Sequence, residues 1–344
     1  MKLLRGLRQT GCCICIWLCS VCLCETLTAD EPAAGTVFSG DEVELSAPDL
    51  GRPPVLTGVI EELAGESVFL RSRGVLRAIP LRDVRQLRFS RPAGYDEGLR
   101  RVQVGEWRGA AEHLTAALAV ESRPWVLREI RAELASCHRS LRAWEACIRE
   151  VTEILDTDPD SRHVLMLPLV WDERLDVAER YVAAMEELQA KSPARRLAAA
   201  SALLSDQKHG SAAEAVLLDL RRHGRGGVVR IAELQLWRVK LGQRESLRIT
   251  DVDQWQERLG EFSRAMRGPG EFLSGRAFRQ LGDLDRAAAS LLWMPLAAPL
   301  DPGSCRAALT EAAAVLEESG RTDDARRIRA RLAAEHSAAT AIQR

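Results

Sequence analysis

Asparagine is absent from all 344 residues, so the chain offers no acceptor for N-linked glycosylation. Aromatic residues make up only 5% of the sequence, and only four of its 48 basic residues are lysine. An excess of one charge is lacking too, because the formal net charge is −1 at pH 7. A near-neutral chain has no electrostatic basis for binding nucleic acid or an anionic membrane surface, so we expect neither.

Motifs of catalysis and of metal binding are also missing. The chain has no glycine-rich phosphate loop ending in Gly-Lys, no Gly-x-Ser-x-Gly elbow and no His-Glu-x-x-His helix. The six histidines are scattered over separate parts of the sequence, which is typical of packed or surface histidines. We therefore expect a protein that is not an enzyme and that carries no cofactor and no metal.

Only one long apolar run occurs, and it lies at the start of the chain. Residues 11–24 carry no charge, basic residues precede them, and Ala29 offers a small-residue cleavage site. A run of about 14 residues is short for a membrane span, which needs roughly 20. The sequence thus predicts a signal peptide over 1–29, export to a bacterial periplasm or cell envelope, and no integral span in the mature chain. Two alternatives stay open: a start site assigned too far upstream, and a membrane-anchored form, held either by lipid attachment at Cys22 or Cys24 or by an uncleaved signal.

Cysteine is scarce beyond the apolar run. Six of the nine cysteines lie within it, which leaves Cys137, Cys147 and Cys305 in the mature chain. Three cysteines are too few for a disulfide scaffold. Cys137 and Cys147 are expected on the two helices of one hairpin, where they could pair in an oxidising compartment. Buried free thiols are the commoner arrangement and are the favoured interpretation.

Residues 36–90, after a linker at 30–35, have the composition of a small β module. Short runs rich in strand-forming residues alternate with turn signals such as Gly51 and Arg73-Gly74. The runs are 43–45, 55–63, 67–70, 76–79 and 84–89. Five short strands with tight turns predict a barrel of the SH3-like or Sm-like kind. Because no aromatic platform is visible, we expect a structural cap or docking module rather than a binder of RNA or proline-rich peptide.

From residue 91 the sequence becomes helical, and one pattern recurs in it. A turn residue is followed five places later by a small residue that would let two helices of a hairpin approach closely. The pairs are Gly105 with Ala110, Arg142 with Cys147, Gly210 with Ala215, Gly282 with Ala287, and Gly320 with Ala325. The pattern predicts a series of helical hairpins.

This pattern resembles the tetratricopeptide repeat. That family also places a small residue about seven positions before the turn, and Gly98, Ala135, Gly275 and Ala313 fit this rule. The resemblance implies an all-α solenoid over 91–344, with clear hairpins at 92–159 and 268–335 and a degenerate middle at 160–267. The expected fold is therefore a multidomain α+β chain, a small β-barrel followed by the solenoid.

In this repeat family the first helices of successive hairpins line a concave groove. The positions carried over from the family as binding residues are Phe272, Arg276, Arg279, Gln280, Tyr95, Glu129 and Arg139. Phe272, Arg276 and Arg279 are spaced by four and three, so they share one helix face. We expect an exposed aromatic ring beside two guanidinium groups, a combination that suits an extended peptide or a carboxylate.

The sequence thus favours an exported, non-catalytic scaffold that binds a protein or peptide in the groove. One alternative is an enzyme, or an accessory subunit of one, with a site in the irregular middle around Trp171 to Glu173. A second alternative is a purely structural spacer. The identity of the partner and the oligomeric state do not follow from the sequence.

Overall fold

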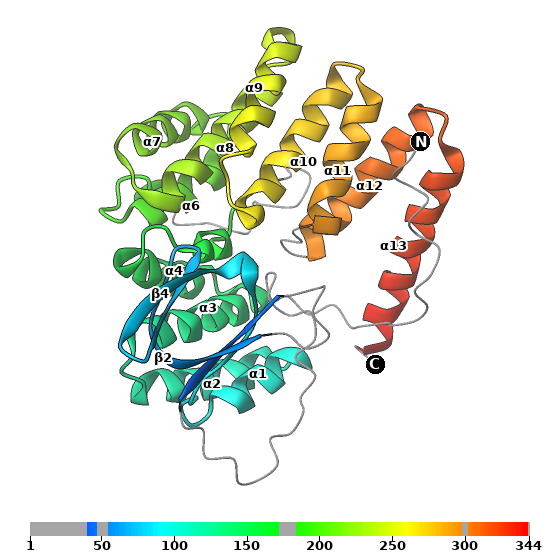
Figure 1. Ribbon diagram of the computed structural model, residues 1–344. Coiled ribbons are helices and arrows are strands. Elements are labelled where there is room, and N and C mark those ends of the chain that lie inside the picture. Colours follow the sequence, from blue (N-terminus) through cyan, green and yellow to red (C-terminus); the bar gives the residue numbers. More distant parts are fainter. Residues whose placement is uncertain (1–39, 47–53, 172–183, 298–301, 343–344) are drawn as a thin grey trace.

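The computed structural model describes residues 40–46, 54–171, 184–297 and 302–342 (Figure 1). Within these ranges a small antiparallel sheet precedes a helical domain of thirteen α-helices, stacked in hairpin-like pairs. The expected signal peptide at 1–29 and the linker at 30–35 lie outside the described residues. Among the described helices, none is both long enough and apolar enough to cross a bilayer.

The sheet has five strands in the order β4-β3-β2-β1-β5, and all described neighbours are antiparallel. The strands are β1 (Asp41–Leu45), β2 (Val55–Ala64), β3 (Ser67–Ser72), β4 (Val75–Pro80) and β5 (Val84–Arg88), with the short 3₁₀ turn η2 (Leu81–Asp83) before β5. These match the five expected runs. The expected closed barrel is wrong, because the edge strands β4 and β5 do not pair with each other and the sheet stays open.

The sheet stays open because helices, rather than its own strands, cover its inner face. Val43, Ile60 and Leu70 lie in one hydrophobic cluster with Trp125 and with residues of the first three helices. The indole Nε1–H of Trp125 also donates a hydrogen bond to the main-chain carbonyl of Ile60 at 3.1 Å. Secondary structure changes near residue 91, but the hydrophobic core continues across that point.

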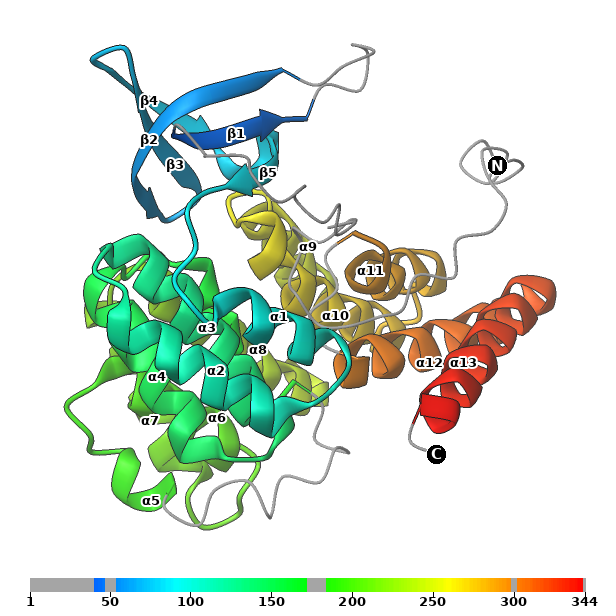
Figure 2. The same cartoon turned by 90° about the horizontal axis from the view of Figure 1, so that it is seen from below.

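The helices follow one another in sequence and pack on their neighbours. They are α1 (Tyr95–Gln103), α2 (Trp107–Val120), α3 (Pro124–Ser140), α4 (Trp144–Thr157), α5 (Ala184–Glu187), α6 (Pro193–Leu203), α7 (Gly210–His223), α8 (Gly226–Gly242), α9 (Ile249–Leu259), α10 (Arg264–Gln280), α11 (Leu284–Ala297), α12 (Pro302–Glu318) and α13 (Thr322–Ile342). Two 3₁₀ turns, η3 (Arg162–Met166) and η4 (Arg244–Ser246), lie between them. The array begins beside the sheet and curves away to α13 on the opposite side (Figures 1 and 2).

Four of the five expected hairpin turns have a common geometry. Gly105, Gly282 and Gly320 have φ between 77° and 81°, a left-handed conformation that glycine adopts without penalty. Arg142 occupies the equivalent position with φ 57°, although it is not glycine. The small residues that follow, Ala110, Cys147, Ala287 and Ala325, are all at most 1% exposed. These four hairpins are therefore confirmed.

The third motif is placed wrongly by the sequence pattern. Gly210 is the first residue of α7 and does not have a positive φ. Ala215 is exposed, whereas Ala213 is fully buried. The reason is a different turn before α7, in which the Asp206 carboxylate accepts hydrogen bonds from the amides of Lys208 and His209.

A candidate peptide-binding groove

The aromatic residue predicted for the groove wall is not exposed. Phe272 is 1% accessible, and the expectation of a solvent-facing ring is wrong. Its face is covered by the Arg276 guanidinium, whose carbon lies 4.4 Å from the ring centroid. Helical spacing correctly places both residues on one face of α10, but that face is packed inside the array.

Arg276 is engaged within the chain. Its Nη2 lies 2.6 Å and its Nε 2.9 Å from Oε1 of Glu311 on α12, and Glu311 is 5% exposed. Its Nη1 also donates a hydrogen bond to the main-chain carbonyl of Trp171 at 3.4 Å. This buried, bidentate ion pair joins α10 to α12 as a fixed part of the structure.

Arg279 and Gln280 lie one turn further along α10, closer to solvent. Arg279 forms an ion pair with Glu318 of α12, and the two side chains are 33% and 44% exposed. Gln280 is exposed, with its amide donating to the main-chain carbonyl of Leu241 at 3.4 Å. The accessible part of the predicted site is therefore its end, at the last turn of α10.

A non-repeat stretch, residues 161–171, which we call the inner segment, packs against α3, α4, α8 and α10. Every residue from His163 to Trp171 is buried, including Pro168. After η3 the segment continues without regular secondary structure from Leu167 to Val170. The chain thus fills the space between its own helices with a piece of irregular chain.

Polar side chains of the helices hold the backbone of the inner segment. The Val170 amide donates to Ser201 Oγ of α6 at 2.9 Å, and the Val170 carbonyl accepts from Gln235 Nε2 of α8 at 3.2 Å. Ser201 and Gln235 are fully buried, and the Ser201 hydroxyl donates to Gln235 Oε1 at 3.1 Å. Together with Arg276 and Trp171, these contacts form a row of side chains from α6, α8 and α10 along one stretch of main chain. Because buried amides and carbonyls must be paired, they fix the register of the segment.

Sequence reasoning missed this row. Ser201 and Gln235 lie in helical stretches where a polar residue reads as solvent-facing. The signal that could have found them is their place among apolar neighbours: Ala200 and Leu234, which precede them directly, are fully buried. A polar residue within such a buried run implies a hydrogen-bonding partner.

Glu129, another predicted groove residue, lies on α3 and holds the start of the inner segment. One carboxylate oxygen accepts from Arg162 Nη2 at 2.7 Å, and the other lies 2.9 Å from His163 Nε2. Burial opposes ionisation of Glu129, but the charge of Arg162 and the contact with His163 outweigh it and lower the pKa of Glu129 to about 2. Burial lowers the pKa of His163 below its ordinary 6.5.

The two remaining predicted residues do not join this row. Tyr95 is 6% exposed and belongs to the core beneath the sheet, where burial and the nearby Glu133 and Glu129 raise the pKa of its hydroxyl. Arg139 lies half-buried in the last turn of α3. The structure therefore does not bring the seven predicted residues into one site: four lie on α10, Glu129 and Arg139 lie at different points of α3, and Tyr95 lies in the core beneath the sheet.

The cysteines show no disulfide in the described structure. Cys137 and Cys147 are free, fully buried thiols. Burial raises the pKa of each thiol to about 12, and the Cys147 thiol donates to the Met166 carbonyl at 3.4 Å. A buried, protonated thiol is a poor nucleophile. The favoured interpretation, small apolar packing residues, agrees with this geometry.

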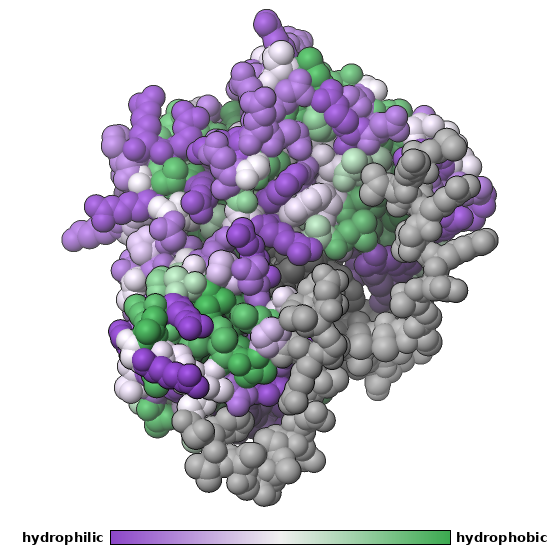
Figure 3. Space-filling model, in the orientation of Figure 1, coloured by the Kyte–Doolittle hydropathy of each residue, from purple (hydrophilic) through white to green (hydrophobic). Residues whose placement is uncertain are grey.

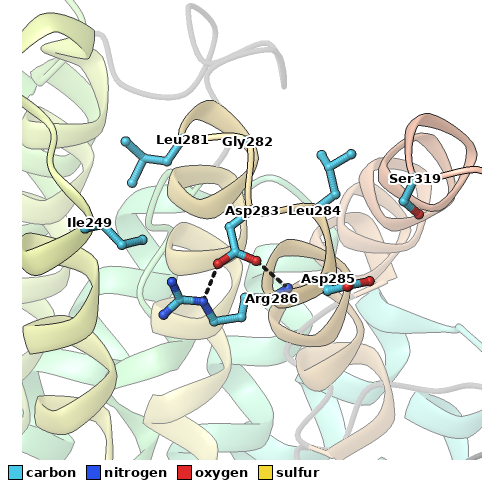
Figure 4. Close-up of a pocket in the computed structure, with 8 residues that line it drawn as sticks. All are labelled: Ile249, Leu281, Gly282, Asp283, Leu284, Asp285, Arg286 and Ser319. Carbon is cyan, nitrogen blue, oxygen red and sulfur yellow. Dashed lines mark hydrogen bonds and ion pairs between the residues drawn. The ribbon is translucent and has the colours of Figure 1, made fainter. Parts of the chain in front are cut away.

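An open, shallow surface hollow of about 790 Å³ lies at the end of the hairpins. Ile249 of α9, the turn and first residues of α11, and Ser319 line it (Figure 4). Its Arg286 is already paired with Asp283, and also with Asp253 at 2.7 Å. Within the described ranges, no three His, Cys, Asp or Glu side chains are grouped to hold a metal. Asp172 and Glu173, which belong to the alternative enzyme site expected around Trp171 to Glu173, lie outside the described residues.

No family model matches the chain, and no curated protein matches it. The tetratricopeptide-like resemblance therefore rests on the turn and packing pattern described above, without an identified family.

Proposed function

We propose that this chain is an exported, non-catalytic scaffold of the cell envelope that binds an extended segment of a partner protein along α10 and α12. One observation carries the proposal. Ser201, Gln235 and Arg276 bind main-chain groups of the inner segment, which is the chemistry that an extended peptide requires. The helices of this array thus already hold one irregular stretch of chain by its backbone.

The partner would bind where the inner segment does not. The side chains of Arg276 and Glu311 are only 16% and 6% exposed, and removing one partner of a buried ion pair costs roughly 3–5 kcal/mol, so we assign this pair to the fold and not to partner contact. Arg279 and Glu318 are exposed, and such a surface pair is worth about 0–1 kcal/mol. Arg279 can therefore exchange Glu318 for a carboxylate of the partner at little cost.

The experiment is affinity capture of the mature chain from its native envelope, followed by titration of the partner segment that is recovered. Arg279→Ala removes one charge-assisted hydrogen bond, worth about 1.5–3 kcal/mol, and should weaken binding tenfold or more. Arg329→Ala on α13 is the control, because Arg329 forms a still more exposed ion pair with Glu317 of α12. Wild-type affinity of Arg279→Ala would contradict the proposal.

The two rival functions give different results in the same experiment. A structural spacer would recover no specific partner. An enzyme acting through the segment after Trp171 would turn over a substrate, and Asp172→Asn with Glu173→Gln would abolish that turnover. Either result would replace the scaffold proposal.

A further inference from the structure

Among the residues that the structure describes, strand β4 is a free edge of the sheet. Arg73 and Gly74 form a two-residue turn with φ of 49° and 81°, and Ser72 pairs with Val75 across it. In such a hairpin the pair that flanks the turn is hydrogen-bonded, and bonded and non-bonded pairs then alternate. The N–H and C=O groups of Leu76 and Ala78 therefore point away from β3, out of the sheet.

The surroundings of this edge are apolar and accessible. The four residues of β4 from Val75 to Ala78 are exposed, with Val75 at 57% and Leu76 at 46%. Leu76 lies on the outer face in a row with Arg71 and Val59, and Val59 is 59% exposed. Figure 3 shows this apolar area over the sheet, interrupted by a few hydrophilic side chains. Proteins usually cover such an edge, because an exposed one is a template for a further strand.

The charges next to β4 favour one kind of strand. Arg77 is exposed and, within the part of the chain that the structure describes, forms no ion pair. At the opposite side of the sheet the acidic strand β1, Asp-Glu-Val-Glu-Leu, lies beside the arginine-bearing β5. There Arg85 contacts Glu44 at 3.0 Å, and Arg88 contacts Glu42 at 3.2 Å. Strand β4 likewise carries an arginine, Arg77, but unlike β5 it has no acidic strand beside it among the described residues.

We propose that β4 is a docking edge for an acidic, extended segment of a partner protein, which adds to the sheet as a sixth strand. Apolar side chains of that segment lie on the outer face beside Leu76 and Ala78. Its acidic side chains lie on the other face, beside Arg77. A second copy of this chain is disfavoured as the occupant, because it would place arginine against arginine. The edge is separate from α10 and α12, so this proposal does not depend on the proposed function.

The test uses a labelled, capped heptapeptide, Glu-Val-Glu-Val-Glu-Val-Glu, and fluorescence anisotropy with the mature chain. We expect saturable binding of this peptide and none of its Lys-Val counterpart. Two further peptides, methylated on backbone nitrogens, test whether the peptide binds through main-chain hydrogen bonds. In an antiparallel addition the valine N–H groups donate to β4, so methylation of the valines blocks binding. In a parallel addition the glutamate N–H groups donate, so methylation of the glutamates blocks it. One version should therefore bind and the other should not. Equal binding of both versions, or of the lysine peptide, would overturn the proposal.

Two protein variants locate the binding. Ala78→Pro removes an outward N–H without breaking the ladder to β3, and Arg77→Glu reverses the local charge. Each should weaken binding at least tenfold, whereas Arg108→Glu, an exposed change on α2, should leave it unaltered. Undiminished binding by Arg77→Glu would count against the edge. If Ala78→Pro does not fold, the methylated peptides still decide the question.

Amide exchange and sedimentation separate the other occupants. In the free monomer the amides of Leu76 and Ala78 should exchange rapidly, and the acidic peptide should protect them. Protection already present in the monomer would mean that another segment of this chain covers the edge. A concentration-dependent dimer that Ala78→Pro abolishes would mean a second copy. Either result would contradict the proposal that an acidic partner segment binds this edge.

Discussion

The side-chain amide of Gln235 in α8 donates a hydrogen bond to the main-chain carbonyl of Val170, across 65 positions of the chain. Gln235 is fully buried. It links a helix in the middle of the array to the inner segment, which is not part of any of the hairpins. The stability of the middle of the array should therefore depend on this polar contact as well as on apolar packing.

Gln235→Leu tests this dependence. The change leaves the buried Val170 carbonyl without its donor, which costs about 1–3 kcal/mol. Urea unfolding monitored by circular dichroism measures the loss. Gln207→Leu, at an exposed position, should stay within about 0.5 kcal/mol of the wild type. An equal effect of the two changes would show that the contact contributes nothing.

Overpacking of the hairpins tests the repeat assignment. Ala110 and Ala287 are 0% exposed, so Ala110→Trp and Ala287→Trp force a large ring into a close helix contact. Each should cost about 1–3 kcal/mol or more. Ala333 is exposed on α13, and Ala333→Trp should cost much less. Thermal melts of the three variants are compared, and identical midpoints would refute the assigned hairpins.

The β3–β4 turn should be improvable. Arg73 has φ 49°, a left-handed conformation that costs a side-chain-bearing residue roughly 1–2 kcal/mol. Asn-Gly is the preferred pair for this turn, so Arg73→Asn should raise the free energy of unfolding by up to about 1 kcal/mol. Arg82→Asn, at an 84% exposed side chain without positive φ, serves as the control in chemical denaturation. A destabilised Arg73→Asn chain would contradict the strain at this turn.

The stability of the chain should fall in acid in two stages. His163 has a lowered pKa in the fold, through burial and the nearby Arg162, partly offset by Glu129 and Asp158. Below its ordinary pKa of 6.5 the unfolded chain binds a proton that the folded chain does not, so stability decreases as the pH falls through 6.5. The pKa of Glu129 is lowered from 4.5 to about 2, so its contribution is lost as the pH falls from 4.5 towards 2.

The measurement is the free energy of unfolding at intervals between about pH 7 and pH 3, so that both stages are sampled. One group contributes a slope of at most about 1.4 kcal/mol per pH unit. His163→Gln should flatten the curve between pH 7 and pH 5 while keeping the decline below 4.5. His223→Gln is the control, since that side chain is 73% exposed. An unchanged slope in His163→Gln would exclude this residue as the cause.

Local patterns in the sequence were enough for the strands and for four hairpins. Arg142 shows the strength of the repeat pattern, because it adopts the positive φ expected of a glycine. Gly210 shows its weakness, since a glycine near a helix start serves another turn equally well. Local signals fix local geometry, and the turn before α7 is decided by Asp206 instead.

The candidate site was predicted less well, because burial depends on segments far apart in the chain. Phe272 and Arg276 share a helix face as expected, but helical spacing does not say what covers that face. The cover includes Glu311, 35 positions away, and Trp171, 105 positions away. The open sheet has the same origin, since its inner face is covered by Trp125 of α3, 65 positions from Ile60.

The cluster shared by the sheet and α1–α3 has a consequence for synthesis. A ribosome delivers Val43 and Ile60 long before Trp125 and Cys137, the partners that complete their core. Until α3 has emerged, the strands present an unfinished apolar face, which is the kind of surface that aggregates or recruits chaperones. The N-terminal half of this protein therefore cannot mature strand by strand as it is made, and must wait for residues translated later.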